Sequence, residues 1–169
     1  TKIIQDTIVS VDLARRPFTL IGDSGDRYSA ETLIIATGAQ ARWLGLPSEE
    51  KYKGFGVSAC ATCDGFFFRG KRVAVIGGGN TAAEEALYLS KLATNVHMFV
   101  RREEMRASKV MQERVKNTSN IKTYWNTETD EILGEKTVEG VRIKNNKSGE
   151  KTEIPVKGFF VAIGHTPNS

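Results

Sequence analysis

A glycine-rich turn between an apolar strand and an apolar helix restricts the fold of this 169-residue chain more than any other feature. The turn reads Gly77-x-Gly79-x-x-Ala82, after an apolar run at 72–76 and before a helical pattern at 81–92. In such a unit the first glycine permits a tight turn and the second lets the backbone approach a pyrophosphate. The alanine allows the helix to pack closely on the strand. The sequence therefore predicts an α/β dinucleotide-binding domain.

The remaining pattern is rich in strands, with one further helix expected at 108–116. A connector containing Pro47 is expected at 39–55. The run Thr-Leu-Ile-Ile-Ala at 32–36 is continuously apolar, so we expect a buried strand there. The other strands are expected at 7–11, 18–21, 95–100, 122–125, 128–133, 138–144, 152–155 and 158–163.

The type of dinucleotide is indicated by the residues that follow the strand at 95–100. An Asp or Glu near this position would bind the ribose hydroxyls of NADH. Here the chain has Arg101, Arg102 and Arg106, whose guanidinium groups suit the 2′-phosphate of NADPH. We therefore expect NADPH rather than NADH. A solvated basic turn without a ligand is the alternative, because Glu103 and Glu104 dilute the local charge.

The two cysteines, Cys60 and Cys63, form a Cys-x-x-Cys pair. The loop that they could close is too short to stabilise the fold, so we expect a chemical role: a reducible disulfide with a thiolate of lowered pKa. Asp64 follows directly and could hold or deliver a proton. A zinc site would need four ligands, and beyond the cysteines the chain offers only His97 and His165. A thioredoxin-like protein would carry the pair on its own βαβ core, whereas here the pair precedes a nucleotide-binding unit.

Composition argues against several other classes of protein. Hydrophobic residues make up 40% and charged residues 26% of the chain, as in ordinary globular proteins. The longest apolar runs fall far short of the roughly 20 residues of a membrane-spanning helix, and the first residues lack a secretory signal pattern. The net charge of +4 is spread along the chain, which argues against nucleic-acid binding. Because the chain does not begin with Met, we expect it to be part of a longer protein.

Three segments, taken in order, closely resemble the low-molecular-weight, bacterial-type thioredoxin reductases, which are class II pyridine nucleotide-disulfide oxidoreductases. They are Ala-Cys-Ala-Thr-Cys-Asp-Gly at 59–65, Val-Ile-Gly-Gly-Gly-Asn-Thr-Ala at 75–82, and the arginines with Ala107. The ending Phe-Val-Ala-Ile-Gly-His-Thr-Pro-Asn at 160–168 fits as well, so the resemblance covers essentially the whole chain. It implies a Rossmann-like, three-layer NADPH-binding domain at 42–163 that carries the redox pair. Part of an FAD-binding domain would precede it at 1–41, and the start of a return segment to that domain would follow at 164–169.

The resemblance also implies roles for individual residues. Cys63 would face the flavin, Cys60 would attack the substrate disulfide, and Asp64 would serve as the acid. Thr37 and Gly38 would lie by the FAD. The residues implied for NADPH are Gly77, Gly78, Gly79, Asn80, Thr81, Ala82, Arg101, Arg102, Arg106, Ile163 and Gly164.

The activity implied by the resemblance is a relay in which NADPH reduces FAD, FAD reduces the Cys60–Cys63 disulfide and the dithiol reduces thioredoxin. The enzyme would be a cytoplasmic homodimer whose flavin and nucleotide domains rotate between two arrangements. Two departures stand out: Val100 replaces the family's common His, and the glycine motif and C-terminal Gly-Asp segment that hold FAD are missing. We therefore expect that this chain alone neither binds FAD tightly nor turns over.

Two alternatives to thioredoxin reductase remain open. The flavoprotein subunit of alkyl hydroperoxide reductase is similar around the dithiol but favours NADH, and the arginines argue against it. A flavin-free module that uses NADPH and a dithiol for redox sensing is the other.

Overall fold

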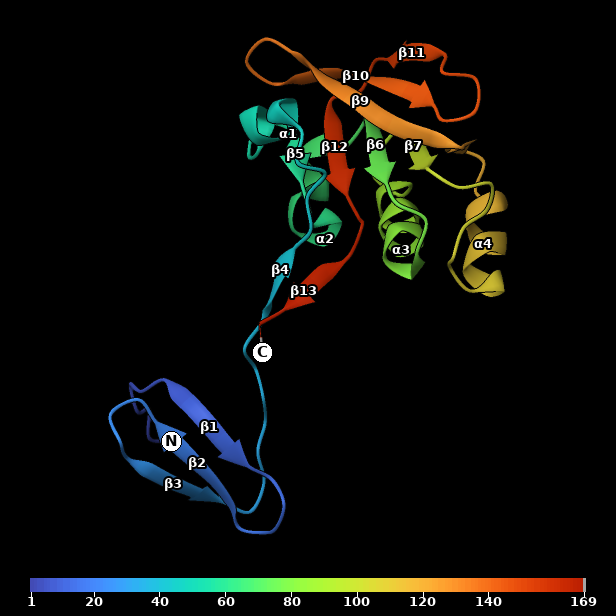
Figure 1. The fold of residues 1–169 in the computed structure, drawn as a ribbon. Coiled ribbons are helices and arrows are strands. Elements are labelled where there is room, and N and C mark those ends of the chain that lie inside the picture. Colours follow the sequence, from blue (N-terminus) through green and yellow to red (C-terminus); the bar gives the residue numbers. More distant parts are fainter. Residues whose placement is uncertain (169) are drawn as a thin grey trace. The chain divides into compact units, whose positions relative to one another are not determined.

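The computed structural model describes residues 1–168, which form two compact units, Thr1–Gly38 and Ala39–Asn168. The first unit is an antiparallel sheet with strand order β1-β2-β3 (Figure 1). Its strands are β1 (Ile8–Asp12), β2 (Phe18–Gly22) and β3 (Arg27–Ala30). The strands expected at 7–11 and 18–21 are thus confirmed within a residue or two at their ends.

Asp6 anchors the hairpin turn between β2 and β3. Its carboxylate accepts hydrogen bonds from the hydroxyls of Ser24 and Tyr28, each at 2.7 Å. Because these bonds favour the ionised form, they lower the pKa of Asp6 to about 2. Gly25, with φ of +88°, takes the backbone conformation that glycine adopts most easily in such a turn. The first unit is therefore held together by its turn as well as by its strand pairing.

The prediction of a buried strand at 32–36 is wrong. No strand is present there, and Ile34 and Ile35 are 90% and 69% exposed. A continuous apolar run is buried only when neighbouring strands and a covering layer are available to it. No strand among residues 1–168 pairs with this segment.

The second unit is built on a five-stranded sheet with strand order β5-β12-β6-β7-β8, and every pairing in it is parallel. Successive residues of a strand point to opposite faces. Val73 and Val75 accordingly pack in the core on one face of the sheet, and Ala74 and Ile76 pack in the core on the other. The strands are β5 (Val57–Ser58), β6 (Arg72–Ile76), β7 (Asn95–Val100), β8 (Ile121–Trp125) and β12 (Gly158–Val161).

Helices cover one face of this sheet. They are α2 (Ala61–Asp64), a 3₁₀ turn η1 (Gly65–Phe68), α3 (Asn80–Leu89) and α4 (Lys109–Lys116). The small side chains Ala82, Ala83 and Ala86 of α3 are fully buried, which lets this helix lie close to β6. Ser108 caps α4 by accepting a hydrogen bond from the backbone of Met111 at 3.4 Å. Both helices expected from the sequence are confirmed.

An antiparallel sheet with order β11-β10-β9 covers the opposite face. Its strands are β9 (Thr127–Gly134), β10 (Val138–Asn145) and β11 (Lys151–Ile154), and Figure 1 shows them on the side of the unit away from α3 and α4. Ile132 and Val141 of this sheet pack against Phe99 and Phe159. The unit is therefore a three-layer α/β domain, which confirms the predicted fold class.

The segment expected to be a plain connector contains two elements, β4 (Ala39–Ala41) and α1 (Pro47–Tyr52). β4 pairs in antiparallel fashion with β13 (His165–Pro167), so 39–41 and 165–167 lie side by side (Figure 1). The domain boundaries predicted from the sequence follow residues 41 and 163, and the two compact units divide after Gly38. Among residues 1–168, no helix has the length and apolar character needed to span a lipid bilayer.

Candidate functional site

The glycine turn between β6 and α3 has the stereochemistry that its sequence predicts. Gly77 has a φ of +142°, and a Cβ built on it would lie 2.3 Å from the carbonyl oxygen of Ala162 and 2.9 Å from the Cβ of Ala82. A side chain therefore cannot be placed there without moving β12 or α3. A Cβ on Gly79 would instead meet no protein atom within 4 Å. Open space thus adjoins the backbone at the position where a dinucleotide motif admits the diphosphate.

A cavity of about 710 Å³ opens at this turn, beside the carboxyl ends of β6 and β12. β6 lies between β7 and β12 in the sheet, so the chain leaves β6 toward one side and returns on the other. In an open α/β sheet, ligands usually bind at the point where the strand order reverses in this way. The volume also falls within the range of pockets for cofactors. Of the residues predicted for NADPH, those that line this cavity are Gly77, Gly79, Thr81, Arg101, Arg106, Ile163 and Gly164.

Three arginines line the cavity, and two of them, Arg101 and Arg106, were predicted from the sequence. Backbone hydrogen bonds hold the segment of Arg106 at the glycine turn. The amides of Arg106 and Ala107 both donate to the carbonyl of Gly78, at 2.6 and 3.1 Å. Arg101 directly follows the end of β7. Within residues 1–168, neither Arg101 nor Arg106 forms an ion pair. Both guanidinium groups are therefore available to an anionic ligand.

Glu103, which the sequence suggests would dilute this positive charge, is paired elsewhere. Its carboxylate forms an ion pair with Lys147, and the hydrogen bond from that ammonium group lowers the pKa of Glu103. The negative charge of Glu103 is thus matched by a cation from the β10–β11 turn. Glu103 therefore does not neutralise Arg101 or Arg106.

The other residues predicted for NADPH do not line the cavity and have structural contacts. Asn80 accepts a hydrogen bond from the Ser108 backbone at 2.8 Å, which ties the starts of α3 and α4 together. Gly78 accepts the two bonds described above, and Ala82 of α3 is fully buried in the core. The carbonyl of Arg102 accepts a hydrogen bond from the Asn126 backbone at 3.0 Å. Thr37 and Gly38, predicted for FAD, belong to the first unit.

Sequence reasoning missed several residues of the cavity. Arg42, Leu44 and Leu46 come from the segment before α1, and Thr127, Glu128 and Thr129 come from the start of β9. None of these residues belongs to a recognisable motif, and they are distant in sequence from the glycine turn. The packing of the antiparallel layer on the parallel sheet brings 127–129 to the cavity. The pairing of β4 with β13 and the hydrogen bond from the Arg42 amide to the Gly164 carbonyl, at 3.0 Å, bring Arg42 there.

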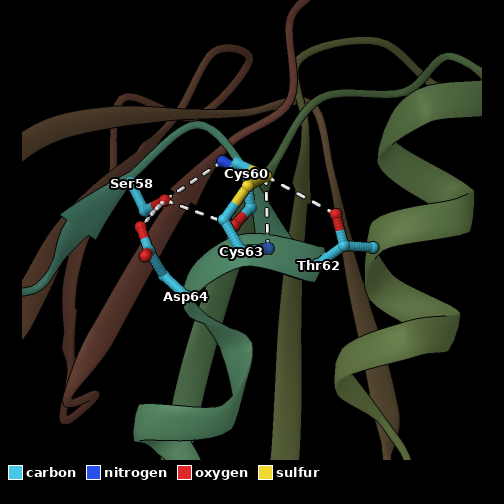
Figure 2. The surroundings of a disulfide bond; sticks show 5 residues. All are labelled: Ser58, Cys60, Thr62, Cys63 and Asp64. Atoms are coloured by element: carbon cyan, nitrogen blue, oxygen red, sulfur yellow. Dashed lines mark hydrogen bonds between the residues drawn. A yellow bond between two sulfur atoms is a disulfide. The ribbon is translucent and has the colours of Figure 1, made fainter.

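The dithiol lies at the start of α2, where Cys60 and Cys63 form a disulfide with a Cα–Cα distance of 5.3 Å (Figure 2). The backbone amide of Cys63 donates to the Sγ of Cys60 at 3.2 Å, and the hydroxyl of Thr62 lies 3.5 Å from the same sulfur. Cys60 is partly buried and Cys63 is exposed. A donor aimed at sulfur favours the thiolate that reduction would release there.

Asp64 is held by Ser58, which was not among the residues predicted from the sequence. Figure 2 shows the hydroxyl of Ser58 between the Asp64 carboxylate and the backbone of Cys60. This hydroxyl donates to Asp64 Oδ2 at 2.6 Å and accepts a bond from the Cys60 amide at 3.0 Å. The one signal in the sequence is that Ser58 precedes Cys60 by two residues.

Glu85 of α3 lies beside the dithiol helix. Burial raises the pKa of Glu85 to about 7, and a backbone hydrogen bond at Ala61 offsets part of that effect. Its Oε2 is buried and has no hydrogen-bond partner among residues 1–168. A carboxyl group that is half protonated near neutral pH thus adjoins α2.

Replacing Glu85 by Gln should stabilise the fold above pH 7 by about 1 kcal/mol, a figure reduced for partial solvent exposure. The folded-state pKa is raised, so ionisation opposes folding. This penalty is absent well below the unfolded-state pKa, develops as the pH rises toward 7 and stays constant above it. Thermal unfolding at pH 5 and pH 8 measures the difference. Glu84→Gln, on the exposed side of the same helix, is the control. An equal effect of Glu85→Gln at both pH values would contradict the assignment.

The comparisons with known proteins agree with this geometry. The family described as Pyridine nucleotide-disulphide oxidoreductase matches residues 1–169, and the chain belongs to that family. Thioredoxin reductase of Escherichia coli O157:H7 is 53% identical over the whole chain, which corresponds to 54% of that protein. A Pseudomonas fluorescens protein named glucosaminate ammonia-lyase is also 53% identical over the whole chain and 53% of its own length.

Solved structures of thioredoxin reductases are also similar to this chain. Thioredoxin reductase from Giardia duodenalis superposes with a TM-score of 0.84 at 41% identity, covering 96% of this chain and 53% of that one. This chain spans about half the length of the curated relatives that it matches.

Proposed function

We propose that the protein containing this chain is an NADPH-dependent thioredoxin-disulfide reductase. One observation carries the proposal: a nucleotide cavity and a redox-active cysteine pair are built on adjacent helices of one domain. Ala61, in the dithiol helix α2, is buried in the same core cluster as Ala82 and Ala86 of α3. Helix α3 begins at the glycine turn that borders the cavity. The names of close relatives support the same activity.

The cavity suits NADPH by its chemistry. The open space at Gly79 would admit the diphosphate, and the guanidinium groups of Arg101 and Arg106 would bind the 2′-phosphate. We assign NADPH binding to residues 42–163 and part of the FAD-binding domain to residues 1–41, with 164–169 returning toward that domain. From the family resemblance we assign Thr37 and Gly38 to the FAD site of the whole protein.

When bound, the two cofactors would supply the two electrons that open the Cys60–Cys63 disulfide. Cys60 is assigned the attack on the substrate disulfide, because the Cys63 amide donates to its sulfur and would stabilise a thiolate there. Exposed Cys63 is assigned the position facing the flavin. Asp64 is assigned the proton that the pair gains or loses as it cycles.

A protein substrate is favoured by the surface next to the dithiol. Phe66 and Phe67 follow α2 directly and are 64% and 70% exposed. Neighbouring exposed aromatic side chains are typical of a surface that docks a protein. From the family resemblance we further propose a homodimer that works in the cytoplasm.

The test is an assay of the full-length protein with FAD, beside the 169-residue chain. We expect the full-length protein to oxidise NADPH when thioredoxin disulfide is present, with a clear preference over NADH, and the chain alone to be inactive. Parallel assays with a peroxiredoxin of the alkyl hydroperoxide type and with glucosaminate address the other candidates. Turnover of either of these, without reduction of thioredoxin, would overturn the proposal.

A further inference from the structure

The side chain of Ser58 is held at a fixed place relative to the dithiol. Ser58 is only 8% exposed and lies in β5, whose residues pair with Phe159 and Phe160 of β12. The strand pairing fixes the backbone of Ser58. Its hydroxyl then contacts two groups of the redox centre, the backbone of Cys60 and the carboxylate of Asp64.

The hydrogen bonds of this hydroxyl can be compared with the number that a serine side chain can form. A serine hydroxyl has one hydrogen to donate and two lone pairs to accept with. The Cys60 amide uses one lone pair, at 3.0 Å. Two oxygens lie within reach of the hydrogen: Asp64 Oδ2 at 2.6 Å and the carbonyl of Cys60 at 3.4 Å. The hydrogen can serve only one of them at a time.

Which of the two oxygens receives the serine hydrogen depends on whether Asp64 is protonated. When Asp64 is ionised, its carboxylate only accepts, so Ser58 donates to it. When Asp64 is protonated, the carboxyl donates to the second lone pair of Ser58, and the serine hydrogen turns to the Cys60 carbonyl. The same atoms therefore satisfy both protonation states, and the Asp64 side chain need not move.

We propose that Ser58 is a positioning residue of the dithiol centre, whose hydroxyl keeps the Asp64 carboxyl in one orientation whether or not it carries a proton. This inference rests on the proposed function, because it gives Asp64 a part in the turnover of the disulfide.

Reduction of the disulfide by the proposed cofactors consumes two electrons and two protons. Two electrons break the Cys60–Cys63 bond and leave two thiolates, each of which becomes a thiol on taking up a proton. A proton from Asp64 to one thiolate leaves a carboxylate, to which Ser58 then donates. Solvent supplies the other proton and restores the proton of Asp64.

The experiment is a double-mutant cycle in the full-length, FAD-containing protein, with Ser58→Ala, Asp64→Asn and the pair together. We expect Ser58→Ala to lower kcat for thioredoxin reduction about tenfold, the size of one lost hydrogen bond to a charged group, with KM for thioredoxin within about twofold. In the Asp64→Asn background the same change should alter kcat by less than about twofold, because the side chain at position 64 then no longer gains or loses a proton. Reduction of the flavin by NADPH should stay at the wild-type rate in every variant.

Two further variants control for loss of structure. Ser58→Thr keeps a hydroxyl in a strand position and should retain most of the wild-type kcat. Ser90→Ala removes a partly buried hydroxyl whose bond is to the Leu87 carbonyl, and should not change kcat. If Ser58→Ala does not fold, Ser58→Val takes its place in the cycle, because valine favours a strand and has the shape of threonine without the hydroxyl.

Equal losses from Ser58→Ala in the wild-type and Asp64→Asn backgrounds would overturn the inference, as would an unchanged kcat in the single variant. A wild-type protein that does not reduce thioredoxin overturns the proposed function, and this inference with it. A wild-type protein that does so, combined with an additive cycle, overturns this inference alone.

Discussion

Cys63→Ser in the full-length protein should lower NADPH-dependent thioredoxin reduction by at least about a thousandfold, because a serine oxygen cannot form or release the disulfide that stores the two electrons. Cys63 is exposed and serine is nearly the same size, so the stability of the fold should change by less than about 0.5 kcal/mol. NADPH consumption in the presence of thioredoxin disulfide measures the rate.

The control for this variant is the first half of the reaction. Reduction of the flavin by NADPH precedes the dithiol in the proposed order, so it should proceed in Cys63→Ser at close to the wild-type rate. A variant that keeps more than about one tenth of its thioredoxin reduction would show that the cysteine pair is not on the electron path. The same conclusion would follow if serine at both Cys60 and Cys63 left the activity intact.

Arg101→Ala combined with Arg106→Ala should weaken NADPH binding about 100-fold and NADH binding less than about threefold. Each guanidinium group lines the cavity without an ion-pair partner among residues 1–168. A charge-assisted hydrogen bond to phosphate contributes about 1.5 kcal/mol, so the loss of two corresponds to about 3 kcal/mol. NADH lacks the 2′-phosphate and should hardly be affected.

Calorimetric titration of the full-length protein with each nucleotide measures this difference. Arg114→Ala is a matched control, because Arg114 is an exposed arginine on α4 that does not line the cavity. It should bind both nucleotides like the wild type. Equal losses of NADPH and NADH in the double variant would mean that the arginines act on the shared diphosphate or on the fold, and the preference for NADPH would then lie elsewhere.

Local patterns in the sequence predicted the central βαβ unit and the glycine turn, because these depend on steric rules that act over a few residues. Gly77 shows this most clearly, because its backbone conformation follows from the need for a tight turn at the end of β6. The cysteine pair could also be found by spacing, since its chemistry requires two sulfurs close together.

Features that depend on neighbours distant in the chain were decided only by the tertiary structure. The run at 32–36 is apolar enough for a buried strand, yet burial requires partners that no local pattern encodes, and Ile34 is exposed. Glu85 looks like an ordinary helix residue in the sequence, and only its burial in the folded protein raises its pKa. The pairing of Glu103 with Lys147 joins residues 44 apart. In each case the outcome depends on which groups become neighbours after folding, because burial and pairing change the free energy of a charged or apolar side chain and are set by the tertiary structure.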